Sequence, residues 1–259
     1  GGARSQISPK LSNLLIGMNS VIFASSRSFI GSQELQTACH HGARVLCISD
    51  VGEEAIARCV NTDFKYIADK SRRIADLLSI GKKLKITTRA GTELSAMINN
   101  RSAVAETGIV EEAGLFSSLP SGKATIMPQR FKMDGVLIVD GSFSHNLLNT
   151  ESLRLDIKGG YVRKIYGNDG AVRLRKLLDK VGKNGREIIE IGLGTNPKAL
   201  LSGQTPEDDK VHGTVHIVLG NRSDDRKFDY VTNRITLIIK SPTLGIDNHL
   251  LIQDGLFKV

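Results

Sequence analysis

The stretch Glu190-Ile-Gly-Leu-Gly-Thr-Asn-Pro197, followed by Gly213-Thr-Val-His-Ile-Val-Leu-Gly220, is the most informative part of this 259-residue chain. Each segment reads as a short apolar strand flanked by glycine, and each carries one ionisable side chain, Glu190 in the first and His216 in the second. An antiparallel return of the chain would place the carboxylate opposite the imidazole. Such a pair is typical of metal sites and of sites for proton transfer.

Composition and charge limit the possible partners. Hydrophobic residues make up 40% of the chain and charged residues 24%, and no apolar run approaches the roughly 18 residues that span a bilayer. Because the basic-then-apolar order of a secretory signal is absent, we expect a cytoplasmic protein with no membrane partner. The net charge of +8 would suit nucleic acid, but the basic residues are dispersed and aromatic residues are only 5%. We therefore expect no nucleic-acid partner.

The first 81 residues alternate between helical and strand-like patterns. This rhythm predicts a small N-terminal βαβ-type domain at 1–81. A helix over 63–80 would be capped by Thr62 at its start and Gly81 at its end. The other predicted elements are strands at 20–24 and 43–48 and helices at 11–18 and 33–41.

From residue 82 onward strand patterns dominate, separated by turns rich in Gly, Asp and Asn. We expect one helix here, at 169–181, and a β-rich domain at 82–259 that could be barrel-like. The fold class is therefore α/β in the broad sense, or α+β. The predicted strands lie at 83–88, 135–139, 152–157, 161–166, 234–239 and 250–252.

Seven motifs in a fixed order resemble the thermophilic-aminopeptidase family of metallopeptidases, whose superfamily also includes the iron-dependent 2,5-dihydroxypyridine dioxygenases. The resemblance runs from about residue 20 to the end of the sequence, and its densest part lies at 187–231. The motifs are Thr87-Thr-Arg-Ala-Gly-Thr92, Ser118-Leu-Pro-Ser-Gly122, Asp134-Gly-Val-Leu-Ile-Val-Asp-Gly141, Glu190-Ile-Gly-Leu-Gly-Thr-Asn-Pro197, Asp208-Asp-Lys210, Gly213-Thr-Val-His216 and Phe228-Asp-Tyr-Val231.

The resemblance implies metal ligands at positions that this chain fills only in part. Glu190, His216 and Asp229 match the family pattern. Lys123 stands where the pattern has a glutamate after Leu-Pro-x-Gly, and Lys227 stands where it has the histidine of a final His-x-Asp pair. A protonated lysine has no lone pair and repels a cation, so a dinuclear metal site is not expected.

Three functions are compatible with this set of residues. In the one we favour, no cofactor is needed: Lys123 and Lys227 supply positive charge, Glu190 and His216 transfer protons, and Asp229 orients a cationic group. The reaction would be hydrolysis or a related acyl transfer, cyclisation or elimination.

In the second, Glu190, His216 and Asp229 hold one iron or zinc, in an aminopeptidase-like hydrolase or an iron-dependent ring-cleaving dioxygenase. In the third, the two lysines form buried salt bridges with Glu190 and Asp229, and the chain is a non-catalytic interaction protein.

The substrate expected from the favoured function is a small polar or anionic molecule. His145, in a turn whose family counterpart lies near the substrate pocket, and the nearby cations Arg222 and Arg226 are the candidates for binding it. The resemblance also implies a homodimer. Three cysteines, Cys39, Cys47 and Cys59, show no metal-binding spacing and are expected to be buried thiols.

Overall fold

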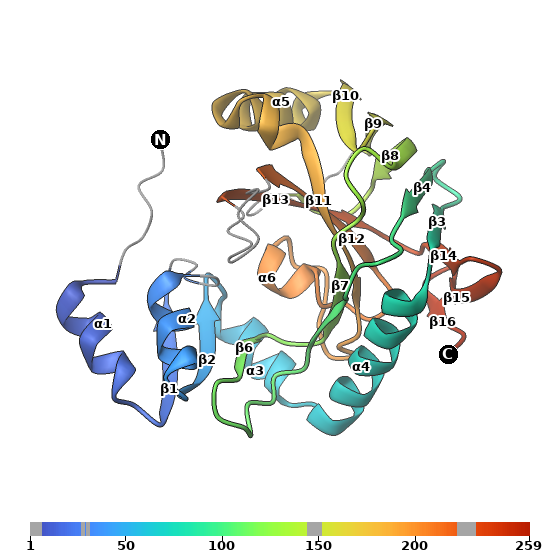
Figure 1. Ribbon diagram of the computed structural model, residues 1–259. Helices are drawn as coiled ribbons and strands as arrows, with labels where there is room; N and C mark the ends of the chain where they lie inside the picture. Colours follow the sequence, from blue (N-terminus) through green and yellow to red (C-terminus); the bar gives the residue numbers. More distant parts are fainter. Residues whose placement is uncertain (1–6, 27–28, 30–31, 144–151, 222–231) are drawn as a thin grey trace.

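The computed structural model describes residues 7–26, 29, 32–143, 152–221 and 232–259 and contains two sheets (Figure 1). The helices are α1 (Pro9–Ile16), α2 (Gln33–His40), α3 (Glu53–Val60), α4 (Phe64–Ile80), α5 (Asp169–Val181) and α6 (Thr205–Asp208), with a 3-10 helix η1 (Lys183–Arg186). The strands are β1 (Ser20–Ser25), β2 (Arg44–Ser49), β3 (Lys83–Thr87), β4 (Glu93–Met97), β5 (Val104–Glu106), β6 (Phe116–Leu119), β7 (Lys123–Ile126), β8 (Met133–Val139), β9 (Leu153–Lys158), β10 (Tyr161–Tyr166), β11 (Glu187–Gly194), β12 (Val215–Asn221), β13 (Thr232–Ile239), β14 (Thr243–Ile246), β15 (His249–Gln253) and β16 (Leu256–Phe257).

The smaller sheet confirms the βαβ rhythm of the N-terminal part. Strands β1, β2 and β6 are parallel and lie in that order, with α2 connecting β1 to β2. Apolar residues of α1, α2, β1 and β2 form a small hydrophobic core, which includes Leu15, Leu35 and Val45. The cap of α4 differs from the expectation: Asp63, not Thr62, accepts the backbone N–H of Tyr66, because the helix begins one residue later than predicted.

The larger sheet is antiparallel and open. Its strands follow the order β13-β12-β11-β10-β9-β8-β4-β3-β14-β15-β16, and β7 attaches to β11 and to β5. One isolated bridge, between Phe143 and Leu237, brings the chain after β8 against β13. In the described residues no continuous ladder closes the sheet, so the β-rich part is a curled open sheet and the barrel expectation is corrected.

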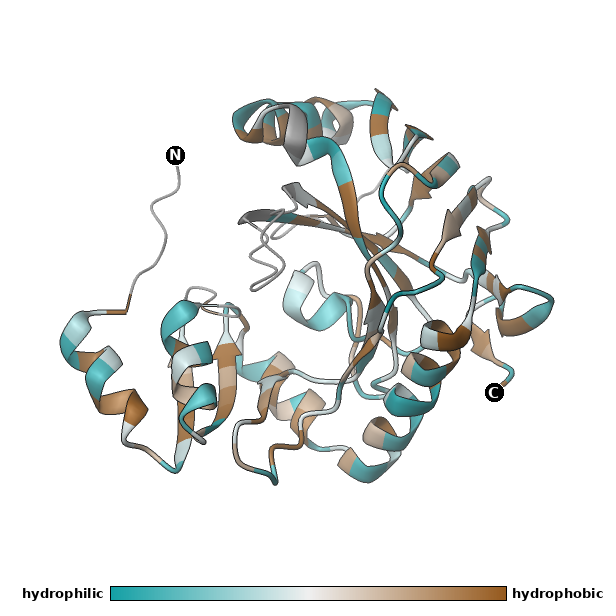
Figure 2. Cartoon of the chain, in the orientation of Figure 1, coloured by the Kyte–Doolittle hydropathy of each residue, from teal (hydrophilic) through white to brown (hydrophobic). Residues whose placement is uncertain are grey.

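A second, larger core lies against this sheet. It is built from alternate residues of the strands and from the inward faces of α4 and α5, and the central strands carry much of the hydrophobic colour in Figure 2. Each of the two parts of the structure includes segments from both sides of residue 81. Ile74 and Leu78 of α4 belong to the larger core, whereas β6 belongs to the smaller sheet. The division at 81–82 stays a prediction.

None of the helices in the part of the chain that the structure describes is long and apolar enough to cross a membrane.

Candidate active site

The strands β11, β12 and β13 separate an apolar face from a polar one. Successive side chains of a strand point to opposite faces, and residues paired across strands share a face. His216 is paired with Gly192 on one side and Ile238 on the other, which places it on the same face as Glu190 and Arg234. The opposite face enters the larger core through Ile191, Leu193, Ile217, Leu219, Ile235 and Leu237.

Strand β7 brings Lys123 to this same polar face. Lys123 pairs with Gly194 of β11 and with Glu106 of β5, while its neighbour Ala124 enters the core. A short helix completes the arrangement, because Asp209 and Lys210 follow α6 directly and are both buried. Six separate segments, β5 among them, thus supply one cluster of ionisable side chains.

Four of these side chains form a closed ring of alternating charge, the charge ring, made of Lys123, Asp209, Lys210 and Glu106. The Nζ atoms of Lys123 and Lys210 each lie 2.7 Å from one carboxylate oxygen of Asp209. Glu106 closes the ring at 3.1 Å from Lys210 and 3.9 Å from Lys123. Each lysine is therefore neutralised by two carboxylates, and burial of the charges is compensated within the ring.

The second group of the site consists of Glu190, His216 and Arg234. Arg234 Nη2 donates to Glu190 Oε2 at 2.6 Å, and His216 Nε2 lies 3.5 Å from Glu190 Oε1. His216 is completely buried, and neither of its ring nitrogens has a hydrogen-bond partner in the part of the chain that the structure describes. The Glu190 Oε1 atom is likewise buried, and no described residue forms a hydrogen bond with it. Buried polar atoms without a partner are uncommon, so these three atoms mark a place where another group is expected to bind.

Burial and neighbouring charge set the protonation of this pair. Burial opposes ionisation of Glu190, but Arg234, the adjacent ring of His216 and the charge of Lys123 together hold the pKa of this carboxyl well below its usual range. Burial lowers the pKa of His216, and its acidic neighbours offset this only in part. At neutral pH the pair is therefore a carboxylate beside a neutral imidazole, one nitrogen of which has a free lone pair.

Glycine in β11 allows the imidazole to lie where it does. A Cβ atom at Gly192 would fall far inside van der Waals contact with the ring of His216, and one at Gly194 would collide with the backbone carbonyl of Val211. The glycines of Gly192-Leu-Gly194 thus serve close packing beside the site.

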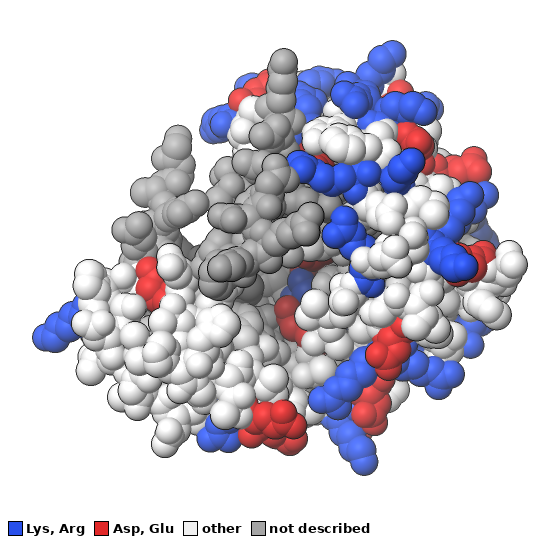
Figure 3. Space-filling view, in the orientation of Figure 1, with Lys and Arg blue, Asp and Glu red and all other residues white. Residues whose placement is uncertain are grey.

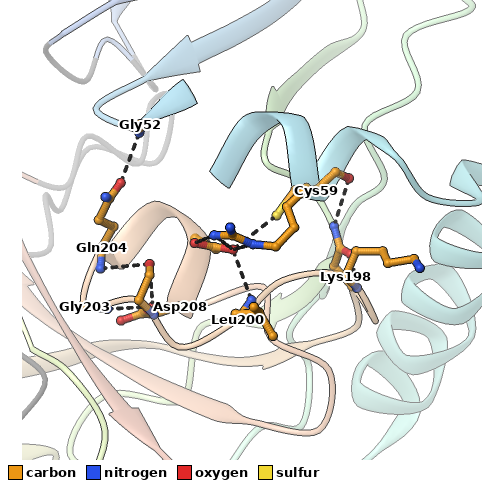
Figure 4. A network of polar contacts seen from close by, with 11 residues as sticks. Gly52, Cys59, Lys198, Leu200, Gly203, Gln204 and Asp208 are labelled. Carbon is orange, nitrogen blue, oxygen red and sulfur yellow. Dashed lines mark hydrogen bonds and ion pairs between the residues drawn. The ribbon is translucent and has the colours of Figure 1, made fainter. Parts of the chain in front are cut away.

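The loop that carries Asp209 is fastened to the N-terminal part of the chain (Figure 4). Arg58 of α3 makes a two-pronged contact with the buried carboxylate of Glu207 in α6, at 2.9 to 3.1 Å. Gln204 accepts the backbone N–H of Gly52 at 3.0 Å, and Asp208 accepts the backbone N–H groups of Ser202 and Gly203. These contacts hold α6 over the polar face of β11 and β12.

Lys123, Glu190 and His216, three of the predicted site residues, lie together. The ion pairs of Lys123 are with Asp209 and Glu106, not with Glu190 as the salt-bridge alternative has it, because Asp209 approaches from above the sheet. The other predicted site residues lie outside the described residues; they are Lys227, Asp229, His145, Arg222 and Arg226.

Glu106, Asp209, Lys210 and Arg234 belong to the cluster but were not assigned from sequence. Only two signals pointed to them: Asp209 and Lys210 lie in the Asp208-Asp-Lys210 motif, and Arg234 opens an apolar strand at the polar position of its alternation. A space-filling view shows both blue and red side chains in a hollow near the middle of the molecule, in the region of α6 (Figure 3).

The described donor atoms do not fit a divalent metal on their own. His216 Nε2 and Glu190 Oε1 are free to ligate, but Asp209 and Glu106 are bound by lysines and the other oxygen of Glu190 by Arg234. Among the described residues no group of three or more His, Cys, Asp or Glu side chains could hold a metal ion. A third ligand would have to come from outside them, and Asp229 is the candidate from sequence.

Solved structures place this fold in a known class. The chain shares the fold of AmpT from Thermus thermophilus, an aminopeptidase fold, with a TM-score of 0.70 at 14% identity, covering 96% of this chain and 79% of that one. It is also similar to 2,5-dihydroxypyridine dioxygenase from Pseudomonas putida KT2440, with a TM-score of 0.82 at 21% identity, covering 96% of this chain and 74% of that one. These likenesses confirm the expected scaffold.

Sequence comparison then gives the family. The family model described as NicX, 2,5-dihydroxypyridine 5,6-dioxygenase, matches residues 8–222, and the chain belongs to this family. A curated relative, 2,5-dihydroxypyridine 5,6-dioxygenase of Pseudomonas putida KT2440, is 28% identical over 176 residues, which are 65% of this chain. The match covers 48% of that relative, so the chain spans about half its length. Lys227 and Asp229 lie beyond the end of the family match.

Proposed function

We propose that this protein is an enzyme acting on a small polar or anionic molecule, with His216 and Glu190 as the groups that move protons and with no metal required. The reaction is hydrolysis or a related acyl transfer, cyclisation or elimination, in each of which a proton is taken up at one atom and delivered to another. The observation that carries the proposal is the buried imidazole of His216, which has no hydrogen-bond partner among the described residues and lies 3.5 Å from the Oε1 atom of Glu190.

The protonation state of His216 supports its role as a general base. A neutral imidazole accepts a proton at its free nitrogen, and the carboxylate beside it stabilises the imidazolium that forms. Arg234 fixes Glu190 from the other side at 2.6 Å, so the carboxylate is held in place for this task.

In this proposal Lys123 does not contact an oxyanion of the substrate directly. Its side chain is only 13% exposed and is bound by Asp209 and Glu106. Its charge therefore acts at short range on Glu190, whose ionised form it favours. Lys227 and Asp229, which lie outside the described residues, keep their proposed roles as a positive charge and an orienting carboxylate.

A second candidate function is iron-dependent ring cleavage, with Glu190, His216 and Asp229 holding one metal ion. Two observations favour it: the family match, and the two free donor atoms of His216 and Glu190 on one face of the sheet. Against it stand the cations Arg234 and Lys123, whose positive charges act on Glu190 and oppose the binding of a metal ion there.

Two measurements separate these functions. Protein purified without chelator is analysed for iron and zinc, and oxygen uptake is followed with 2,5-dihydroxypyridine before and after ferrous iron is added. We expect substoichiometric metal and no iron-dependent oxygen uptake. Stoichiometric iron that is lost in His216→Ala, together with ring cleavage, would replace the first proposal by the second.

The acid–base role is tested on any substrate found by screening small amides, lactams, amino acids and hydroxypyridines by proton NMR. His216→Asn is expected to lower kcat by about 100-fold or more, since general acid–base groups contribute on that scale. The matched control is His249→Asn, which changes an exposed histidine of β15 and is expected to leave kcat unchanged. Equal turnover by both variants would remove His216 from the mechanism.

The homodimer and the cytoplasmic location remain proposals that rest on the resemblance and on composition. Light scattering of the purified chain tests the first, with a mass of twice 28.1 kDa as the expected result.

A further inference from the structure

Arg234 differs from the other cations of the site in how many of its hydrogen-bond donors have a partner among the described residues. A guanidinium has five N–H donors. Among the described residues Arg234 contacts only Glu190, through Nη2, and its side chain is 40% exposed. Lys123 and Lys210, by contrast, are 13% and 4% exposed, and each is bound by two carboxylates.

The unused donors of Arg234 lie close to the unpartnered atoms of the site. Glu190 joins the two, because one of its oxygens contacts Arg234 and the other faces His216 Nε2. A ligand held by Arg234 would therefore lie beside the buried imidazole. Since Arg234, Glu190 and His216 point from the same face of β11, β12 and β13, no rearrangement of the sheet is needed to bring them to one molecule.

We infer that Arg234 is the substrate-binding residue of this site and that its ligand is the carboxylate of a small molecule. The inference rests on the proposed function, because it names the substrate class of the same site. The planar guanidinium matches a carboxylate with two parallel hydrogen bonds, which an ammonium does not reproduce. The three described acids of the cluster balance its three cations, so recognition depends on the directed donors of Arg234 rather than on excess positive charge.

The test is a comparison of two ligands of the same shape that differ in charge. Nicotinate and nicotinamide are titrated into the full chain by isothermal calorimetry. We expect nicotinate to bind about tenfold more tightly or better, the ratio given by one charge-assisted hydrogen bond. In Arg234→Gln the preference disappears, and Arg234→Lys keeps only part of it.

The matched control is Arg89→Gln. Arg89 also contacts a single carboxylate, that of Asp254 at 2.8 Å, but it is 87% exposed and lies in the turn between β3 and β4. It is expected to keep the full preference for nicotinate. Because Arg234→Gln leaves Glu190 without its partner, the double variant Arg234→Gln/Glu190→Gln is measured as well, and it too is expected to show no preference.

Equal affinities for the two ligands, no binding of either, or a preference that survives Arg234→Gln would overturn the inference. His216→Asn separates this outcome from failure of the proposed function. If His216 moves protons and Arg234 binds substrate, this variant loses turnover but still prefers nicotinate. A preference that depends on Arg234 in a protein that also proves to need iron would support the inference while contradicting the metal-free mechanism.

Discussion

The position of His216 depends on the absence of a side chain at Gly192. We expect Gly192→Ala to push the imidazole from its place and to destabilise the fold by about 1 to 3 kcal/mol, the cost of an extra methyl group in a filled interior. Urea unfolding measures the stability change. Gly17→Ala is the control, because a Cβ at the end of α1 meets only an ordinary contact.

A double-variant cycle tests whether the imidazole itself is the obstacle. In a His216→Ala background, Gly192→Ala is expected to cost much less than it does alone, since the colliding ring is absent. If the two losses of unfolding free energy were fully additive, the cost of Gly192→Ala would arise from the backbone and not from the ring of His216.

The thiols give a second test at the level of single residues. Burial and the neighbouring carboxylate of Glu207 raise the pKa of Cys59 to about 12, so almost none of it is thiolate at pH 8. We expect Ellman's reagent to leave Cys59 and Cys47 unreacted in the native protein and to modify all three cysteines in urea. Cys39, predicted to be buried, is instead partly exposed and should react first. Rapid modification of Cys59 in the native state would contradict its placement.

Residue by residue, the sequence could identify only the groups that lie in a pattern. Glu190 and His216 were predicted from glycine-flanked strands. The return is antiparallel as expected, but the register places His216 opposite Gly192 and Glu190 opposite Val218, so the two side chains are diagonal neighbours on one face. Glu106 could not be predicted, because β5 is three residues long and reaches Lys123 only through the ladder with β7. Residues that are brought together only by the register of two paired strands show no characteristic spacing in the sequence.

At the level of elements, the attachment of α6 to α3 holds the charge ring in place. Arg58→Ala leaves the fully buried carboxylate of Glu207 without its cation. Loss of one partner of a buried pair costs about 3 to 5 kcal/mol. Because Arg58 is itself partly exposed and Leu200 still donates to Glu207, we expect about 2 kcal/mol, measured by urea unfolding.

Arg154→Ala is the matched control for this prediction. Its ion pair with Asp156 lies on the surface, where such pairs contribute roughly 0 to 1 kcal/mol. If the two variants lose the same small amount of stability, α6 is not held by Arg58.

Element prediction was accurate where periodicity is strong. Helix α5 has the bounds expected for it, 169–181, because its apolar stripe is flanked by glycine and charge. Strand β6 was missed: only its residues 118 and 119 lay in a motif, and nothing local indicates that the strand pairs with β2, which lies about 70 residues earlier. The same non-local pairing explains why the open sheet could not be distinguished from a barrel.

At the scale of the molecule, the described residues form two sheets with separate cores, and the buried charges lie where segments from both parts meet. Burial opposes ionisation of Asp209, but Lys123 and Lys210 lower the pKa of this carboxyl below its usual value. A carboxyl whose pKa is lower in the folded state stabilises the fold above its unfolded pKa of about 4 and loses this contribution as the pH falls through the folded value.

The free energy of unfolding should therefore fall steeply below about pH 4. Asp209→Asn is expected to be less stable at pH 7 and to show a shallower decline in acid, as followed by urea unfolding between pH 7 and pH 2. The exposed-site control is Asp134→Asn, whose ion pair with Lys158 lies at the surface. If the free energy of unfolding of Asp209→Asn fell below pH 4 as steeply as that of the unchanged protein, the charge ring would not govern stability in acid.

The central claim is that His216 is a neutral imidazole with a free nitrogen that binds substrate or a proton and not a metal. Nitrogen-15 NMR of labelled histidine at pH 7, with His216→Asn used for assignment, tests this directly when zinc or ferrous iron is added. The account predicts one protonated and one free ring nitrogen in His216, unchanged by either metal. A large shift or loss of the free-nitrogen signal at one equivalent of metal would contradict it.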